Sequence, residues 1–187
     1  MVVVLITGET CAGKGTFCSK LEEIFPGKVA RLKFSDILGD ALEARRMSRC
    51  WENYQKIHAM LRKEHGDDVL TLEMEKRIKE AEVSYVLIDG GRARSDYEMV
   101  RKFENNFVVH LTADILIRYN RFLARSEKLG DEKITFQQFV ELENAPGQLR
   151  IRQIELLADL VINTNFSTSF ADGLFRSIMA IQNRHLI

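Results

Sequence analysis

The first sixteen residues join an apolar, largely β-branched run at residues 2–6 to a glycine-framed segment at residues 8–16. Such a run predicts a buried strand, and the pattern Gly-x-x-x-x-Gly-Lys that follows predicts a loop opening into a helix. Gly8 and Gly13 let the backbone turn its N–H groups inward, where they can bind phosphate oxygens. Lys14 and the helix N-terminus add positive charge at the same place. The segment therefore predicts a nucleoside-triphosphate site.

Gly15 follows the lysine, where many such loops have the Ser or Thr that ligates Mg²⁺, and Thr16 comes one residue later. We therefore expect Thr16 to contact the α-phosphate, and a metal contact of Thr16 to run through water. The loop residues expected to bind the donor are Gly8, Cys11, Ala12, Gly13, Lys14, Gly15 and Thr16.

Composition narrows the class of protein. With 187 residues, 45% of them hydrophobic, the chain suits one α/β domain with a full core. Its 27 basic and 27 acidic residues balance, which argues against non-specific nucleic-acid binding. No apolar run is long enough to span a membrane, and three cysteines at no metal-ligand spacing indicate reduced thiols. We expect a cytoplasmic protein; the sequence does not define its oligomeric state.

Strand-like and helical segments alternate along the chain. After the first strand, the sequence predicts strands at residues 29–34, 83–88, 107–111 and 160–162. This alternation predicts parallel pairing with right-handed crossovers. Ligands in such folds bind beyond the carboxyl ends of the strands. We therefore searched those ends for residues that could carry chemistry.

Two carboxylates follow predicted strands. Asp89, at the end of the third strand, fits a carboxylate that orients the water shell of a magnesium ion; the alternative is a turn or capping residue. Asp36, after the second strand, is placed to position an acceptor or its metal, and it can equally serve only as a helix N-cap. Arg92 is placed to bind an acceptor phosphate, and Arg94 is the substitute candidate.

Arginines repeat on one predicted helix. Arg121 and Arg125 are four residues apart, and Arg118 lies three residues before Arg121. Because such a like-charged cluster is repulsive without an anionic partner, we expect it to stabilise a phosphoryl group in transfer. Arg45, on the inserted helices, is a further candidate for the acceptor phosphate.

Taken in order, these segments resemble the P-loop nucleoside-monophosphate kinase superfamily, in particular archaeal adenylate-kinase-related proteins and, more loosely, dephospho-coenzyme A kinases. The resemblance covers nearly the whole chain and rests on GETCAGKGT, FSD, LRKEHGDDV, VLIDGGRARSDYE, RYNRFLAR and ADLVINTN. The first motif is specific for the superfamily, and the others are specific as an ordered set.

The resemblance implies a three-layer α/β/α P-loop NTP hydrolase fold whose five-stranded parallel sheet has the order 2-3-1-4-5. It also implies a helical acceptor-binding insert at about residues 36–65, a short lid at about 126–135, and a core formed by residues 1–35, 66–125 and 136–187. ATP with Mg²⁺ would be the donor, and Asn163 and Asn165 would lie near its base.

The leading functional hypothesis is a kinase that transfers the γ-phosphate of ATP to a nucleoside monophosphate, AMP or a deoxynucleotide. Dephospho-coenzyme A is the alternative acceptor; its hydroxyl group would benefit from Asp36 as a base. From another class, the chain could be an adenylate-kinase-like ATPase switch that acts on a protein or ribonucleoprotein partner. An exposed apolar patch on the inserted helices would favour that last alternative.

Overall fold

The computed structural model describes residues 1–125 and 133–185. Strands and helices alternate along this part of the chain. Their bounds are β1 (Val2–Gly8), α1 (Lys14–Ile24), β2 (Val29–Leu32), α2 (Phe34–Ala44), α3 (Trp51–His65), α4 (Val69–Glu80), β3 (Tyr85–Gly91), α5 (Arg94–Arg101), β4 (Asn106–Thr112), α6 (Ile115–Arg125), α7 (Phe136–Glu143), α8 (Pro146–Glu155), β5 (Leu160–Asn163) and α9 (Ser167–His185).

The five strands form one parallel sheet in the order β2-β3-β1-β4-β5, which confirms the predicted topology. β1 occupies the centre, where Leu5 pairs with Ile88 of β3 on one side and with Val108 of β4 on the other. The loop that follows β1 therefore emerges between the carboxyl ends of β3 and β4, where a parallel sheet gathers its functional residues.

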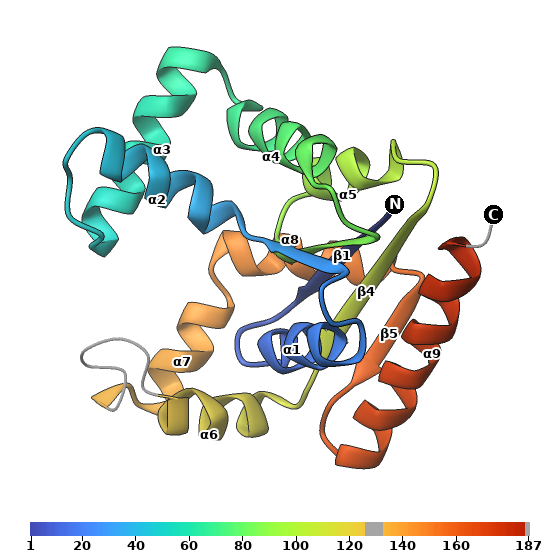
Figure 1. Ribbon diagram of the computed structural model, residues 1–187. Coiled ribbons are helices and arrows are strands. Elements are labelled where there is room, and N and C mark those ends of the chain that lie inside the picture. The colour runs from blue at the N-terminus through green and yellow to red at the C-terminus, as the bar shows by residue number, and fades with distance from the viewer. Residues whose placement is uncertain (126–132, 186–187) are drawn as a thin grey trace.

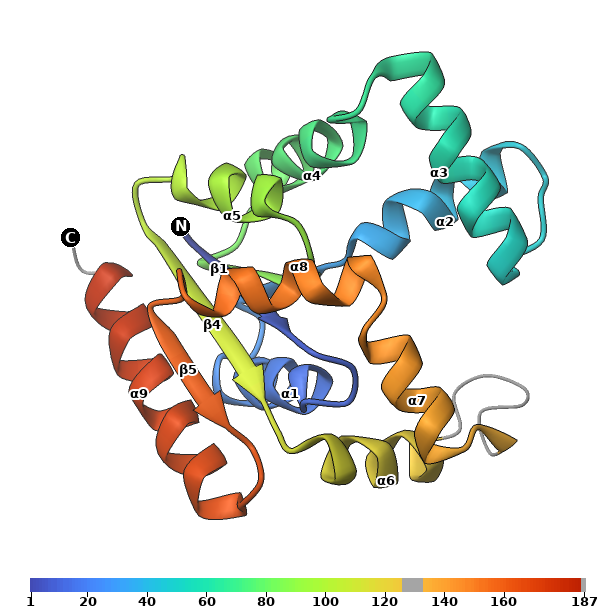
Figure 2. The same ribbon diagram turned by 180° about the vertical axis from the view of Figure 1, so that it is seen from behind.

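Helices cover both faces of the sheet, so the fold has three layers. α1 lies in front of the sheet in Figure 1, and α8 lies on the opposite face in Figure 2. Because side chains alternate along a strand, Val4 of β1 packs in the layer with Phe17 of α1, whereas Leu5 packs in the other layer with Met74 of α4 and Ile154 of α8. The hydrophobic residues 2–6 are all fully buried.

Helices α2 and α3 project from one end of the sheet (Figure 1). Their facing sides form a second small core built on Leu42, Ile57 and Leu61, against which Val69 and Leu70 of α4 also pack. This pair of helices corresponds to the segment that the sequence marks as an insert at about residues 36–65.

The boundary between β2 and α2 differs from the sequence-based prediction. The strand ends at Leu32 and not at Phe34, because Phe34 begins α2 and packs with Ile37 against the core layer on the α4 side. Lys33 is the residue that precedes the helix, so Asp36 lies within its first turn. The interpretation of Asp36 as the N-cap is therefore wrong.

The region around the predicted lid is described only in part. Residues 126–132, the larger part of the lid expected at 126–135, lie outside the described residues. A capping box opens α7, in which Thr135 Oγ1 accepts a hydrogen bond from Gln138 N at 3.3 Å. α7 ends at Glu143, and Pro146 occupies the first position of α8, where its missing N–H costs nothing.

Across residues 1–125 and 133–185, we find no helix with both the length and the apolar character needed to cross a bilayer.

Gly173 sets the distance between α9 and β5. A Cβ atom built there would lie 2.6 Å from Cγ2 and 2.7 Å from Cγ1 of Ile162. We expect Gly173→Ala to lower the free energy of unfolding by about 1–3 kcal/mol, because the clash outweighs the better helix propensity of alanine. Urea unfolding should show this loss, whereas the exposed Asp172→Ala should change stability little. A more stable Gly173→Ala variant would contradict the close packing of α9.

Candidate active site

The loop after β1 has the backbone conformation that a phosphate cradle needs. Gly8, Cys11 and Gly13 all have positive φ, at 139°, 59° and 96°. A Cβ atom on Gly8 would lie 2.1 Å from the carbonyl oxygen of Leu111 in β4, so only glycine fits there. The chain then enters α1 at Lys14, with Gly13 in the left-handed conformation directly before it. Strand, loop and helix thus have the arrangement that the sequence pattern predicts.

Lys14 is the cation of this loop. Its Nζ donates hydrogen bonds to the carbonyl oxygens of Gly8 and Glu9, both at 2.8 Å, so the ammonium group lies inside the curve of the loop. Burial and, after it, the nearby Arg92 cation together lower the pKa of Lys14 to about 8. An anionic ligand in the loop would reverse this effect by favouring the charged amine.

Asp89 is held by an arginine that the sequence reading does not single out. Nε and Nη2 of Arg31 donate to Asp89 Oδ2 at 3.0 and 2.5 Å, which joins β2 to β3. Lys33 Nζ lies 4.0 Å from the same oxygen. No described residue donates to Asp89 Oδ1, so this oxygen is available to a water molecule or another ligand.

Two charged side chains at the carboxyl ends of β2 and β3 have no partner among the described residues. The Asp36 carboxylate accepts no hydrogen bond and forms no ion pair there. The Arg92 guanidinium is exposed and equally unpaired, although its backbone N–H donates to Asp96 Oδ2 at 2.8 Å. Because β2 and β3 are neighbours, these groups belong to the same edge of the sheet as Lys14.

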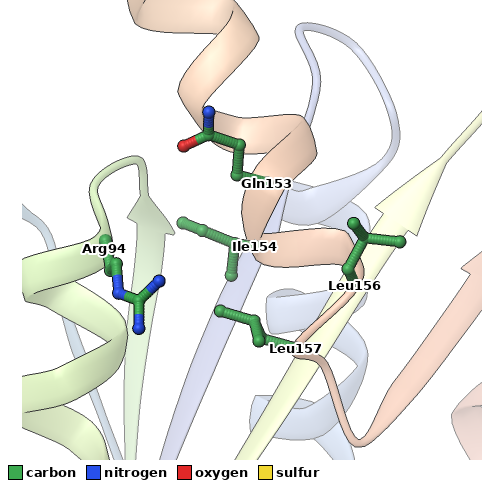
Figure 3. A pocket seen from close by; sticks show the side chains of 5 residues that line it. All are labelled: Arg94, Gln153, Ile154, Leu156 and Leu157. Carbon is green, nitrogen blue, oxygen red and sulfur yellow. The ribbon is translucent and has the colours of Figure 1, made fainter.

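Two other arginines that were predicted to bind the acceptor form ion pairs with glutamates. Arg45 Nη2 lies 2.8 Å from Glu64 Oε2, which joins α2 to α3. Arg94 Nε donates to Glu98 at 2.8 Å on its own helix. Figure 3 shows Arg94 at a hollow that is otherwise lined by α8 and the residues after it, namely Gln153, Ile154, Leu156 and Leu157. We therefore leave Arg94 out of the proposed site.

Arg121 ties three segments together. Its Nη2 donates to the carbonyl oxygen of Thr164 at 2.6 Å, and its Nη1 donates to Thr164 Oγ1 at 2.9 Å and to the carbonyl oxygen of Cys11 at 3.4 Å. Thr164 Oγ1 in turn donates to the carbonyl oxygen of Ala12 at 3.0 Å. The loop after β5 is thereby fixed against the phosphate-binding loop. Arg125, exposed at the end of α6, directly precedes the residues outside the description.

The asparagines expected near the donor base shape the loop after β5. Asn163 Oδ1 accepts a hydrogen bond from the backbone N–H of Asn165 at 2.9 Å. Asn165 Oδ1 accepts one from the N–H of Asp114 at 2.8 Å, which links this loop to the segment before α6. Both amides therefore have a structural role, whether or not they also contact a nucleotide base.

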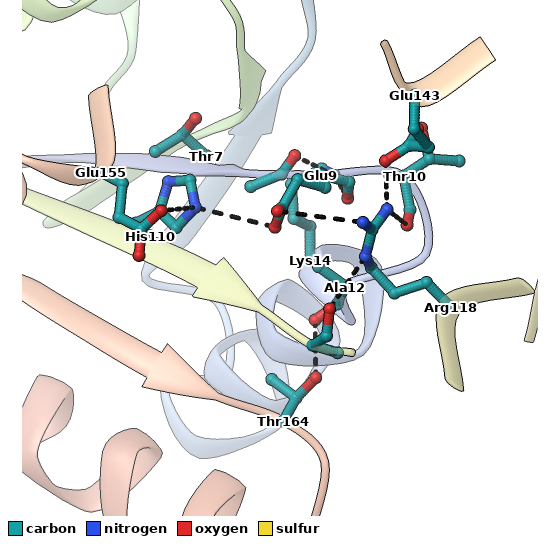
Figure 4. A network of polar contacts seen from close by, with 12 residues as sticks. Thr7, Glu9, Thr10, Ala12, Lys14, His110, Arg118, Glu143, Glu155 and Thr164 are labelled. Atoms are coloured by element: carbon teal, nitrogen blue, oxygen red, sulfur yellow. Dashed lines mark hydrogen bonds and ion pairs between the residues drawn. The ribbon is translucent and has the colours of Figure 1, made fainter. Parts of the chain in front are cut away.

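Beneath the phosphate-binding loop lies a buried charged network that the sequence reading misses (Figure 4). Arg118 is 2% exposed and pairs closely with Glu143 of α7, which is 1% exposed. Nη2 of Arg118 lies 3.9 Å from Glu9 Oε1, and its Nη1 donates to the carbonyl oxygen of Thr10 at 3.3 Å. Arg118 was expected to act with Arg121 and Arg125 on a phosphoryl group, but its charge is neutralised by Glu143, 25 residues further on.

His110 of β4 extends this network on its other side. The ring is fully buried, and Nε2 lies 3.8 Å from Glu9 Oε2 and 3.8 Å from Glu155 Oε2. Burial raises the pKa of the Glu9 carboxyl, but His110 and Arg118 outweigh it and hold that pKa below its ordinary value. A glutamate inside the loop and a histidine inside an apolar strand were the visible sequence signals of this contact.

The arrangement fits a nucleotide triphosphate and a hydrated magnesium ion. The loop supplies inward backbone curvature and a lysine whose amine bonds only to loop carbonyls among the described residues. Thr16 is exposed at the start of α1, and Asp89 retains an oxygen without a described donor. Asp89 and Thr16 are the residues that would face the metal and its water.

A parallel sheet of this order with such a loop after its central strand defines the P-loop NTPase type of fold. Residues 4–144 match the family model described as AAA domain, and the chain belongs to that family.

A UPF0200 protein from Methanothermobacter thermautotrophicus is 29% identical over 163 residues, which cover 87% of this chain and 80% of the relative. The solved structure of TT1252 from Thermus thermophilus is similar with a TM-score of 0.62 at 14% identity, covering 96% of each chain. Shikimate kinase from Acinetobacter baumannii in complex with shikimate is similar with a TM-score of 0.55 at 15% identity, covering 98% of this chain and 94% of that one. At these identities the structural likenesses show the fold.

Glu143→Gln tests the buried network. The change keeps the shape of the side chain but removes the charge that compensates Arg118, and breaking a buried ion pair typically costs about 3–5 kcal/mol. We expect a loss of this size in the free energy of unfolding, measured with denaturant. Glu141→Gln, an exposed change on the same helix, is the matched control. Equal effects of the two variants would contradict the burial of an essential pair.

The lowered pKa of Lys14 predicts a pH dependence of phosphate-ligand binding. Below about pH 8 the amine of the ligand-free protein is charged, so binding needs no proton. Above this pH, binding must take up a proton, and affinity falls by up to about tenfold per pH unit. Titrations of fluorescent ATP at several pH values between 7 and 10 should show this decline. Lys14→Arg stays charged over the range, so a decline of equal slope in that variant would contradict the assignment.

Proposed function

We propose that the protein is an ATP-dependent kinase that transfers the γ-phosphate to a small nucleotide-like acceptor, a nucleoside monophosphate in the first place. The observation that carries the proposal is the position of the Lys14 amine inside a glycine-framed loop, with unpaired Arg92 and Asp36 at the same edge of the sheet. The loop would bind the triphosphate of a donor, and the two unpaired charged groups would bind an acceptor.

Each residue has a role that follows from phosphoryl-transfer chemistry, which asks a protein mainly for positioning and positive charge. Lys14 and the loop N–H groups would hold the donor phosphates. Arg92 would bind the acceptor phosphate, and Arg121 and Arg125 would stabilise the group in transfer. In its present position Arg121 bonds to the loop after β5, so this role requires that it exchange Thr164 for phosphate oxygens.

Magnesium bound at this site would neutralise charge on the donor phosphates. Asp89 would orient its water shell through Oδ1, and Thr16 would contact the metal's water or the α-phosphate. The helices α2 and α3, which form the insert at about residues 36–65, would enclose the acceptor; Arg45, paired with Glu64, would reach an acceptor phosphate only by leaving that partner.

An acceptor with a hydroxyl group is the second candidate, and dephospho-coenzyme A is the first such compound to test. Asp36 favours this candidate, because a carboxylate without a protein partner can accept the proton of an attacking hydroxyl. The likeness in fold to a shikimate kinase structure adds shikimate to the panel of hydroxyl acceptors.

A partner-driven ATPase switch remains the alternative from another class. An exposed apolar patch on the inserted helices would favour this alternative, because a partner could bind there. Among the described side chains of α2 and α3, no large apolar one is exposed. We favour the kinase because Lys14 in its loop and the unpaired Arg92 and Asp36 supply groups for both a donor and an acceptor.

A coupled ADP-release assay tests the proposal directly. ATP and Mg²⁺ are supplied with AMP, CMP, UMP, GMP, deoxynucleotides, dephospho-coenzyme A or shikimate, one at a time. We expect one acceptor to stimulate turnover strongly and Lys14→Ala to abolish it. Asp36→Asn then separates the two acceptor classes: a loss of about 10²–10⁴-fold indicates a hydroxyl acceptor, whereas a phosphate acceptor needs no base. A slow background with every acceptor would favour the ATPase switch.

A further inference from the structure

The position after the P-loop lysine has an unusual neighbour. Loops with Ser or Thr at this position use its hydroxyl to ligate magnesium. This chain has Gly15, and a Cβ atom built on it would lie 3.6 Å from Nη2 of Arg31. The space that a magnesium-binding side chain would enter is thus beside a guanidinium group from β2.

Arg31 is fixed in this place by carboxylates from two other elements. Its Nε and Nη2 donate to Asp89 Oδ2 of β3, and its Nη1 lies 3.7 Å from Glu22 Oε2 of α1. The side chain is only 19% exposed. A charge held by side chains from two neighbouring elements needs little rearrangement to act on a ligand, which makes it an effective electrostatic group.

The Arg31 guanidinium also places positive charge beside Asp89, the carboxylate expected to face a magnesium ion. Asp89, the carboxylate that would orient the water shell of magnesium, already has Arg31 on one oxygen and Lys33 Nζ at 4.0 Å. Because like charges repel, fixed cations beside a divalent metal lower the affinity for that metal. They also attract phosphate oxygens in its absence.

We propose that Arg31 is a resident cation of the donor site, which supplies positive charge to the phosphates of a bound nucleotide beside Gly15. The protein then binds nucleotide without magnesium, and magnesium adds less affinity than it would without Arg31. This inference rests on the proposed donor site, and it adds a residue to which neither the loop motif nor the family resemblance assigns a role.

The competing explanation is that Arg31 only braces β2 against β3. The chain offers a matched pair for comparison. Arg101 also forms two hydrogen bonds with one aspartate, Asp159, at 2.9 and 3.0 Å, and the side chains are 26% and 24% exposed. Asp159 directly precedes β5, so this pair lies at the amino ends of the strands, opposite the phosphate-binding loop. Arg101→Gln therefore reports the effect of losing a structural brace.

The test measures binding of ADP that carries a fluorescent methylanthraniloyl group, in EDTA and in excess Mg²⁺. We expect the unmodified protein to bind in EDTA within about tenfold of its affinity with Mg²⁺. The Arg31→Gln variant loses a charge-assisted contact with the nucleotide. We expect it to bind about tenfold or more weakly than the unmodified protein in EDTA, with a smaller loss of affinity in Mg²⁺. Arg31→Lys, which keeps the charge, should retain most of the affinity in EDTA. Arg101→Gln should match the unmodified protein in both conditions.

The outcomes separate this inference from the proposed function. Failure of the unmodified protein to bind ADP or ATP in either condition would overturn both. Binding that requires Mg²⁺ in the unmodified protein would overturn the resident cation alone. Equal weakening of Arg31→Gln in EDTA and in Mg²⁺ would identify Arg31 as a brace. If Arg31→Gln fails to fold, as circular dichroism would show, the unmodified protein and Arg31→Lys decide the question.

Discussion

The burial of β1 on both faces fixes where the glycine-framed loop leaves the sheet. All hydrophobic residues of the strand are inaccessible to solvent, and neighbours on both sides pair with it. The chain leaves the sheet at the carboxyl end of β1 and enters the loop there. At this point Gly8 passes so close to the Leu111 carbonyl that no side chain fits. The curvature of the loop and the position of Lys14 both follow from this close approach.

Polar and charged side chains from β4, α6, α7 and α8 then hold the loop in place. Glu9 belongs to the loop, His110 to the neighbouring strand, and Arg118 to α6, while Glu143 and Glu155 come from α7 and α8. A hydrogen bond between Gln148 Nε2 and Thr10 Oγ1, at 3.1 Å, adds a second contact from α8. Because the buried charges of Glu9, Arg118 and Glu143 are costly unless paired, the loop, α6 and α7 have to keep their relative positions.

The sequence predicts most of the fold because its signals are local. Alternating strand and helix patterns predict the parallel sheet, and the spacing of Gly8, Gly13 and Lys14 predicts the loop. The pairs that complete the site join distant residues: Arg31 with Asp89, and Arg118 with Glu143. Helical spacing shows that Arg118 is near Arg121 in sequence, but it cannot show which carboxylate arrives from another helix. Only the packed structure distinguishes a buried cation from an exposed one.

The small separate core of α2 and α3 has an evolutionary consequence. Leu42, Ile57 and Leu61 pack with one another, whereas the donor loop is held by the sheet and by α6, α7 and α8. Substitutions around this second core can therefore accumulate with little effect on the loop after β1, whereas Phe34 and Ile37 of α2 pack in the core of the sheet. Under the proposed function, a lineage could change its acceptor by remodelling this one module, and descendants with the same loop could differ widely in specificity.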